Sequence, residues 1–255
     1  MTAALTIAGS DPSGGAGIQA DLKTFHQHGV YGMAVITLIT VQNTQEVSAV
    51  EVLPAALVKA QAEAVLRDIP PGAVKTGALG NAAIIEAVAS LKLTMPLVVD
   101  PVMISKHGHA LLAADAREAL VKRLLPVTTL LTPNTQEAAA LLGTPVDTLA
   151  QAEAAARAIA AMGPKAVLVK GGHLTGAQAV DVLFHDGHLT HFTAPRIETK
   201  HTHGTGCTYS AAITAHLARG ETLHASISRA KHWLTEALRT APGLGHGIGP
   251  VNHFA

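Results

Sequence analysis

This 255-residue sequence has few of the features that mark secreted, membrane-bound or nucleic-acid-binding proteins. It has one cysteine, which excludes an internal disulfide and suits a reducing compartment. Only 14% of residues are charged, with 18 basic and 18 acidic side chains, so bulk charge indicates no nucleic-acid or membrane partner. There is no apolar run of about 20 residues and no basic leader, which predicts neither a membrane span nor a signal peptide. We therefore expect a cytoplasmic protein.

Several familiar catalytic motifs are also missing. The sequence has no Gly-x-x-x-x-Gly-Lys-Ser/Thr loop, no Gly-x-Ser-x-Gly elbow and no His-Glu-x-x-His helix. The 15 histidines have no cysteine cluster beside them, which disfavours a dedicated zinc site. Gly15, Gly17 and Ala20 match a dinucleotide-binding fingerprint, but the next strand ends in Gln42 and Asn43 without the required acid. A dehydrogenase is therefore disfavoured.

What the sequence does contain is an alternation of short apolar runs and helical segments. Strands are predicted at 4–8, 33–41, 47–53, 73–76, 96–100, 127–132 and 165–170, and an Asp186-Gly187 hairpin at 180–184 and 189–193. Helices are predicted at 17–28, 54–67, 82–91, 115–125, 134–142, 148–162, 207–219 and 223–239. This pattern indicates one α/β domain over residues 1–255, with a mostly parallel sheet, helices on both faces and a late antiparallel hairpin at one edge.

Polar and glycine-rich segments follow the predicted strands. They lie at 9–17, 42–44, 100–101, 132–134 and 170–173. Ligands of open α/β sheets bind beyond the carboxyl ends of the strands, so these loops predict one substantial site.

The loop Gly204-Thr205-Gly206-Cys207 opens an apolar helix and is the strongest local signal of function. Glycines permit a tight turn, and the free amides at the helix N-terminus attract an anion such as phosphate. A thiol at this position is expected to have a lowered pKa, which makes Cys207 a candidate base. The alternative is a common turn followed by an inert buried cysteine.

Asn134 and Glu137 allow two interpretations. Their spacing forms a helix-capping pair, which the residues alone favour, and it also suits a hydrated Mg²⁺ near phosphates. Asp100, at the end of a buried strand, either shares such a metal or caps the next turn.

Motifs spread over almost the whole chain resemble those of bacterial hydroxymethylpyrimidine/phosphomethylpyrimidine kinases, within the ribokinase-like superfamily. They lie in order at 4–25, 30–33, 41–44, 75–77, 98–103, 132–134, 169–173, 202–207 and 249–253. The resemblance implies a ribokinase-like fold. It also implies MgATP-dependent phosphorylation of 4-amino-5-hydroxymethyl-2-methylpyrimidine, and then of its monophosphate, for thiamine synthesis. The family also suggests a homodimer.

The same resemblance assigns roles to residues. The phosphate loop and base map onto Gly204, Thr205, Gly206 and Cys207, although most ribokinase relatives carry Asp at the cysteine position. The resemblance further implies a pyrimidine pocket of Gln42, Gly9, Ala16 and Asp21, a nucleotide-phosphate contact at Lys170, and a metal site at Asn134 and Glu137, with Asp100 beside it. It thus favours the metal interpretation of the Asn134/Glu137 pair.

Some positions depart from the family pattern. Ala78 stands where a methionine often packs on the ring, which weakens the case for strict pyrimidine specificity. Val41, His201 and Tyr209 replace a common Ala, Asn and Leu, and His107 and His109 fall in a loop that usually reads Ser-Gly-Asp. A pyridoxal or pyridoxine kinase on the same fold is the alternative activity, and a non-catalytic pyrimidine sensor is the alternative from another class. Residues 105–110 are one candidate for a lid.

Overall fold

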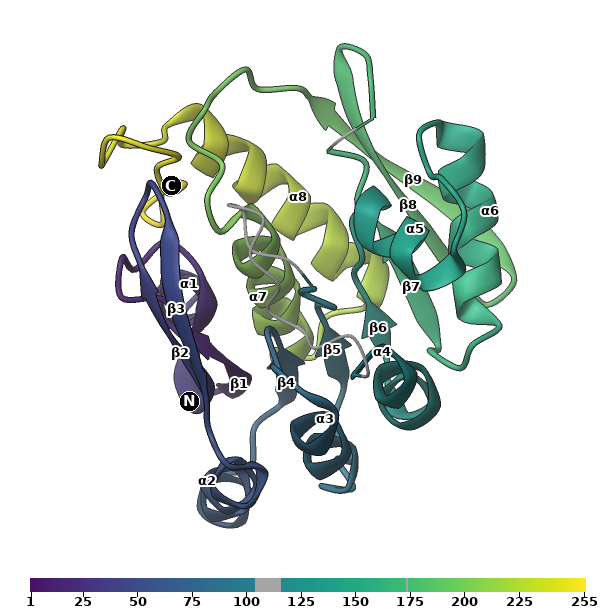
Figure 1. Cartoon of the computed structure of the whole chain (residues 1–255). Coiled ribbons are helices and arrows are strands. Elements are labelled where there is room, and N and C mark those ends of the chain that lie inside the picture. Colours follow the sequence, from purple (N-terminus) through teal and green to yellow (C-terminus); the bar gives the residue numbers. More distant parts are fainter. Residues whose placement is uncertain (104–115, 173) are drawn as a thin grey trace.

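The computed structural model describes residues 1–103, 116–172 and 174–255. The described residues form one nine-stranded sheet in the order β3-β2-β1-β4-β5-β6-β7-β8-β9 (Figure 1). Its strands are β1 (Ala3–Ser10), β2 (Tyr31–Gln42), β3 (Val47–Val52), β4 (Ala73–Thr76), β5 (Leu97–Val99), β6 (Leu130–Leu131), β7 (Ala166–Val169), β8 (Gln178–His185) and β9 (His188–Pro195). The expected α/β fold with its mostly parallel sheet is confirmed.

The two edges of the sheet are antiparallel. At one edge β8 and β9 pair through the predicted hairpin, whose turn residues Asp186 and Gly187 both have positive φ. This geometry is that of a tight hairpin turn. At the other edge β3 pairs antiparallel with β2, which the sequence analysis did not predict. The four residues between these strands are too few for the crossover that a parallel connection needs.

The helices are α1 (Gly17–Gln27), α2 (Ala55–Asp68), α3 (Ala82–Ala89), α4 (Ala116–Ala119), α5 (Thr135–Leu142), α6 (Leu149–Ala160), α7 (Thr205–Ala218) and α8 (Leu223–Arg239). The predicted capping box of α6 is present, with Thr148 and Gln151 bonded reciprocally. The helix predicted over 115–125 is present in its described part, but its geometry changes along its length. There α4 passes into a π-helical turn at Leu120–Leu124 and a 3-10 turn at Leu125–Val127, where Pro126 cannot supply a backbone N–H.

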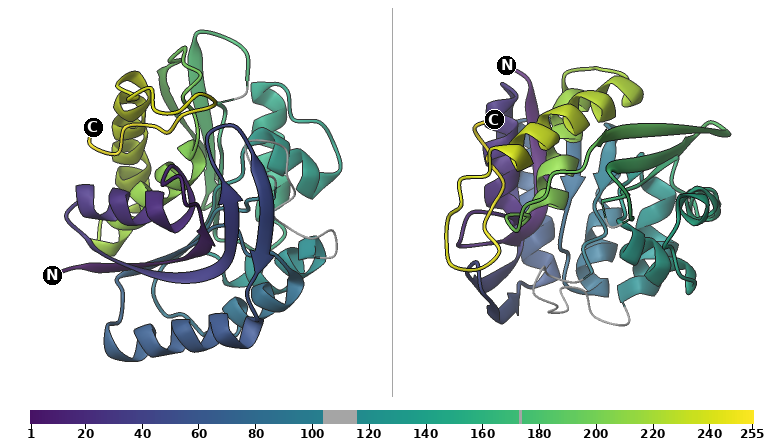
Figure 2. Two further views of the ribbon diagram at one scale, coloured as in Figure 1. Left: turned by 60° about the vertical axis from the view of Figure 1, so that its left-hand side comes forward. Right: turned by 90° about the horizontal axis from the view of Figure 1, so that it is seen from above.

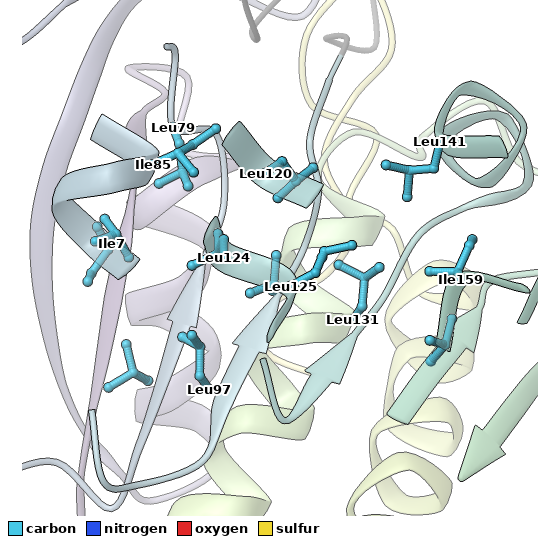
Figure 3. Packing of buried hydrophobic residues seen from close by; sticks show 14 of the residues in the cluster. Ile7, Leu79, Ile85, Leu97, Leu120, Leu124, Leu125, Leu131, Leu141 and Ile159 are labelled. Atoms are coloured by element: carbon cyan, nitrogen blue, oxygen red, sulfur yellow. The ribbon is translucent and has the colours of Figure 1, made fainter. Parts of the chain in front are cut away.

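Two layers of helices bury the two faces of the sheet. Side chains of α2, α3, α5 and α6 share a core with one face, and Figure 3 shows part of it, including Ile7, Ile85, Leu131 and Ile159. Helices α1, α7 and α8 pack on the opposite face. Viewed from above in Figure 2, α7 and α8 lie on one side of the sheet and the teal helices on the other.

The predicted lid at 105–110, including His107 and His109, lies outside the described residues. No helix in the part that the structure describes is long and apolar enough to cross a bilayer.

Candidate active site

A cavity of about 730 Å³ lies at the carboxyl ends of the parallel strands. Residues that follow five different parallel strands line it, as expected for ligand sites of open α/β sheets. Eleven of the twelve predicted site residues contribute to its wall: Gly9, Ala16, Gln42, Asp100, Asn134, Glu137, Lys170, Gly204, Thr205, Gly206 and Cys207. The structure therefore brings these residues together at one site, while their chemical roles stay predictions.

The loop before α7 is shaped by its glycines. Gly204 has a φ of +76°, and a Cβ at this position would overlap the carbonyl oxygen of Gly15. Thr208 bonds back to Gly204, so the helix starts at once, while the N–H groups of Gly206 and Cys207 have no recorded acceptor among the described residues. These free amides belong to the first turn of the 14-residue helix α7, at the cavity wall, where they suit an anionic group.

A lysine and a carboxylate lie beside this helix start. Lys170 Nζ donates to Asp100 Oδ1 at 2.8 Å, and a Cβ on Gly206 would lie 3.3 Å from the same Nζ. Burial alone lowers the pKa of Lys170, but Asp100 and Glu137 outweigh it and raise the pKa above its usual value. Lys170 is therefore a permanent cation next to the free amides.

Asn134 and Glu137 form the capping box that their spacing predicts. Asn134 Oδ1 accepts from the Glu137 N–H at 2.8 Å, and Glu137 Oε2 accepts from the Asn134 N–H at 2.7 Å. Burial raises the pKa of Glu137 to about 7, against the opposing charge of Lys170. The capping role is thus observed, and it leaves Glu137 Oε1 as the oxygen able to face a ligand.

The donor set fits a hard cation bound mainly through water and phosphate oxygens. Glu137 and Asp100 supply carboxylate oxygens on the cavity wall. Among the described residues no group of three or more His, Cys, Asp or Glu side chains is placed to enclose a metal. Mg²⁺ keeps several waters and uses one or two carboxylates in such sites, so these residues suit Mg²⁺ carried with a nucleotide.

The expected lowering of the Cys207 pKa is wrong. Desolvation raises the pKa of the thiol to about 11 from a usual value near 9, although Lys75 and an N–H from Gly17 act in the opposite direction. The charge at a helix N-terminus is a local feature visible in the sequence, whereas burial depends on the packing of distant segments. Cys207 is therefore a protonated thiol at neutral pH in the ligand-free protein.

This high pKa has a directly measurable consequence. We expect iodoacetamide to alkylate Cys207 at neutral pH about 100-fold more slowly than a thiol of pKa 9, because only the thiolate reacts. The rate should rise about tenfold per pH unit up to about pH 11. Mass spectrometry of the intact protein measures the alkylation rate of Cys207 alone, since Cys207 is the only cysteine, and Cys207→Ser is the unreactive control. A rate that levels off below pH 8 would show that the helix terminus dominates after all.

Asp21 does not line the cavity, which corrects the prediction for this residue. Its carboxylate is fully buried between β1 and β4, where Lys75 Nζ donates to Oδ1 at 2.6 Å and Thr6 Oγ1 to Oδ2 at 2.6 Å. Asp21 is on α1, one helical turn past Gly17, and its side chain points into the sheet interior. It supports the floor of the site instead of contacting a ligand.

Two pairs of ionisable residues on the cavity wall were not predicted as site residues. Asp11 Oδ2 lies 2.8 Å from His203 Nε2, close to Gln42, and Lys231 Nζ donates to Asp181 Oδ2 at 2.7 Å. Asp11 lies in the glycine-rich segment 9–17 and His203 directly precedes the predicted phosphate loop. Their closeness in sequence to predicted site residues could have identified them. Asp181 and Lys231 lie on β8 and α8, and no local pattern distinguishes them.

Two kinds of polar group line the same cavity. One is the carboxamide of Gln42 with the carboxylate of Asp11, and the other is the set of free amides of the α7 loop with Lys170. Free amides at a helix start, the Lys170 cation and two carboxylates suited to Mg²⁺ line one cavity, and these are the groups that a phosphotransferase acting on small molecules requires.

Comparison with known proteins agrees with this class. The family model for phosphomethylpyrimidine kinase matches residues 11–252, and the chain belongs to that family. It is 49% identical over 252 residues to the hydroxymethylpyrimidine/phosphomethylpyrimidine kinase of Streptomyces coelicolor, covering 98% of this chain and 93% of the relative.

Two solved structures are also similar. The phosphomethylpyrimidine kinase of Clostridium difficile superposes with a TM-score of 0.82 at 45% identity, covering 93% of this chain and 100% of that one. The pyridoxal kinase of Staphylococcus aureus in complex with AMP-PCP and pyridoxal gives 0.92 at 35% identity, covering 100% and 94%. The predicted family and ribokinase-like fold are therefore confirmed.

Proposed function

We propose that this chain transfers the terminal phosphoryl group of ATP to the hydroxymethyl group of 4-amino-5-hydroxymethyl-2-methylpyrimidine, and then to the resulting monophosphate. The observation that carries the proposal is the continuity of the cavity. Gln42 on its wall suits an aminopyrimidine, and Gly206 and Lys170 on the same wall suit a transferring phosphate. The diphosphate product would serve thiamine synthesis.

In the proposed reaction the substrate hydroxyl oxygen forms a bond to the γ-phosphorus while the bond from that phosphorus to the β,γ-bridging oxygen breaks. ADP leaves, and the thiolate form of Cys207 takes the hydroxyl proton and becomes the thiol. The Gly206 and Cys207 amides and the Lys170 ammonium hold the transferring oxygens and stabilise their negative charge. Glu137 and Asp100 would hold Mg²⁺, which when bound neutralises phosphate charge.

Pyridoxal is the second candidate acceptor. Ala78 lines the cavity, and its small side chain leaves room for a pyridine ring with more substituents. The similarity to a pyridoxal kinase at a TM-score of 0.92 also favours testing it.

A product assay separates the candidates. We expect purified protein with MgATP to convert the pyrimidine to its mono- and diphosphate, detected by mass spectrometry, and to phosphorylate pyridoxal more slowly. Phosphorylation of pyridoxal alone would overturn the pyrimidine assignment, and no ATP turnover with either acceptor would favour a binding protein. We further propose a homodimer in the cytoplasm, which light scattering and cell fractionation test.

A further inference from the structure

Three polar side chains from distant parts of the sequence meet at the acceptor end of the cavity. His203 Nε2 lies 2.8 Å from Asp11 Oδ2 and 3.1 Å from the Gln42 amide nitrogen, Nε2. Asp11 and His203 are buried, at 3% exposure each, and Gln42 is half-buried on the cavity wall. A single imidazole nitrogen therefore contacts both a carboxylate and a carboxamide.

Asp11 is an ionised acceptor. Its Oδ1 accepts from the Ser13 N–H at 2.9 Å and the Ser13 hydroxyl at 2.7 Å, and its Oδ2 accepts from the Ala16 N–H at 2.8 Å. Burial alone raises the pKa of Asp11, but the hydrogen bonds from His203 and Ser13 outweigh it and lower the pKa. A carboxylate in this state accepts hydrogen bonds and donates none.

The contact with Asp11 fixes the hydrogen on His203. Nε2 must carry a hydrogen that points to Asp11, and this holds for the neutral Nε2–H tautomer and for the imidazolium alike. A ring nitrogen that carries its hydrogen cannot accept one from the Gln42 NH₂ group. The 3.1 Å contact is therefore favourable only when the terminal amide of Gln42 is turned by 180°, with its oxygen toward His203.

We propose that Asp11 and His203 are a positioning pair that holds the Gln42 carboxamide in one orientation, with its oxygen toward His203 and its NH₂ group toward the acceptor. The Nε2–H hydrogen is then shared between Asp11 and Gln42. This inference rests on the proposed function for the identity of the acceptor, and on the contacts alone for the orientation of the amide.

The orientation has a consequence for specificity. The NH₂ group of Gln42 is left to donate to a ring nitrogen, and the second lone pair of its oxygen is left to accept from an exocyclic amino group. An aminopyrimidine offers both partners side by side. Pyridoxal has no amino group, so it satisfies only one of them.

The histidine ring is held firmly enough for this role. A Cβ on Gly15 would lie 2.5 Å from His203 Cδ2, so the loop packs directly on the ring. The backbone N–H of His203 donates to the Gly249 carbonyl at 3.0 Å. The ring is thus fixed from the N-terminal loop and from the C-terminal segment.

The protonation of the ring is testable without any substrate. Long-range ¹H–¹⁵N NMR spectra of the wild-type protein should show a protonated Nε2 for His203, with its resonance identified by loss in His203→Gln. A bare Nε2 with the hydrogen on Nδ1 would overturn the proposal. The measurement needs no enzymatic activity, so it decides the amide orientation even if the proposed function fails.

Kinetics then test whether His203 acts through Gln42. We expect His203→Leu to raise the KM for the pyrimidine about five- to tenfold, as for the loss of one hydrogen bond, with little change in the KM for ATP. Its kcat/KM for the pyrimidine relative to pyridoxal should fall. His203→Gln, which restores a side-chain N–H, should recover part of the loss, and His201→Asn, two residues away, is the matched control.

The double variant separates positioning from a general structural effect. If His203 acts through Gln42, the His203→Leu/Gln42→Ala protein should have a pyrimidine KM close to that of Gln42→Ala alone. Losses that multiply would overturn the positioning role. Absence of pyrimidine turnover in the wild-type protein would instead reject the proposed function and leave the NMR result standing.

Discussion

Replacing Asp21 with asparagine is expected to lower the free energy of unfolding by about 3–5 kcal/mol, because it leaves the Lys75 ammonium buried without a counter-charge. Both side chains are completely buried, and the 2.6 Å contact joins α1 to β4 beneath the cavity. Burial alone lowers the pKa of Lys75, but Asp21 outweighs it and raises the pKa, so the lysine stays charged in the native protein. Urea unfolding at neutral pH measures the loss.

A double-mutant cycle distinguishes the lost pair from a general packing defect. Lys75→Met should also be destabilising, whereas Asp21→Asn/Lys75→Met should lose less than the two single variants together, since neither charge remains buried. The control is the exposed pair Lys59 and Glu63, 3.8 Å apart on α2, where Glu63→Gln should change stability by less than about 1 kcal/mol. Equal effects at the two sites would contradict the argument.

The buried pair also shows where prediction from sequence ends. The Asp186-Gly187 hairpin and the Thr148/Gln151 capping box involve residues within a few positions of each other, and both are found as predicted. Asp21 is 54 residues from Lys75, and nothing near it in the sequence indicates that a lysine on β4 takes its carboxylate away from the cavity.

The candidate site also has features that the sequence predicts and features that it does not. Loops after parallel strands must gather at one edge of a sheet, so the convergence of Gly9, Gln42, Asp100 and Lys170 on one cavity follows from topology. The pKa of Cys207 does not, because it depends on the desolvation of the thiol and on Lys75, Asp21 and Asp100, which come from distant parts of the sequence.

Replacing Cys207 with alanine is expected to keep the fold and reduce kcat about 10²- to 10⁴-fold, the usual contribution of a general base. The thiol pKa of about 11 means that the thiolate is scarce at neutral pH in the ligand-free protein. Cys207 acts in the reaction through this minor thiolate form, so turnover that depends on it should rise with pH. The hydroxyl proton is lost late in a loose phosphoryl transfer, when the new bond to phosphorus has made it acidic. The base at that point is the thiolate of Cys207, because a thiol that already carries its proton cannot accept a second one. The thiolate does not have to ionise the alcohol first.

A series at position 207 tests this assignment. Cys207→Ser replaces the thiol with a hydroxyl of similar size that ionises less readily. We therefore expect it to lose nearly as much turnover as Cys207→Ala. Cys207→Asp supplies a carboxylate as base and should retain more. Both KM values should change little in the alanine and serine variants, since the amides of Gly206 and residue 207, which we propose as the phosphate donors, remain. Unchanged turnover in Cys207→Ala, with circular dichroism and thermal unfolding like the wild type, would reject Cys207 as the base.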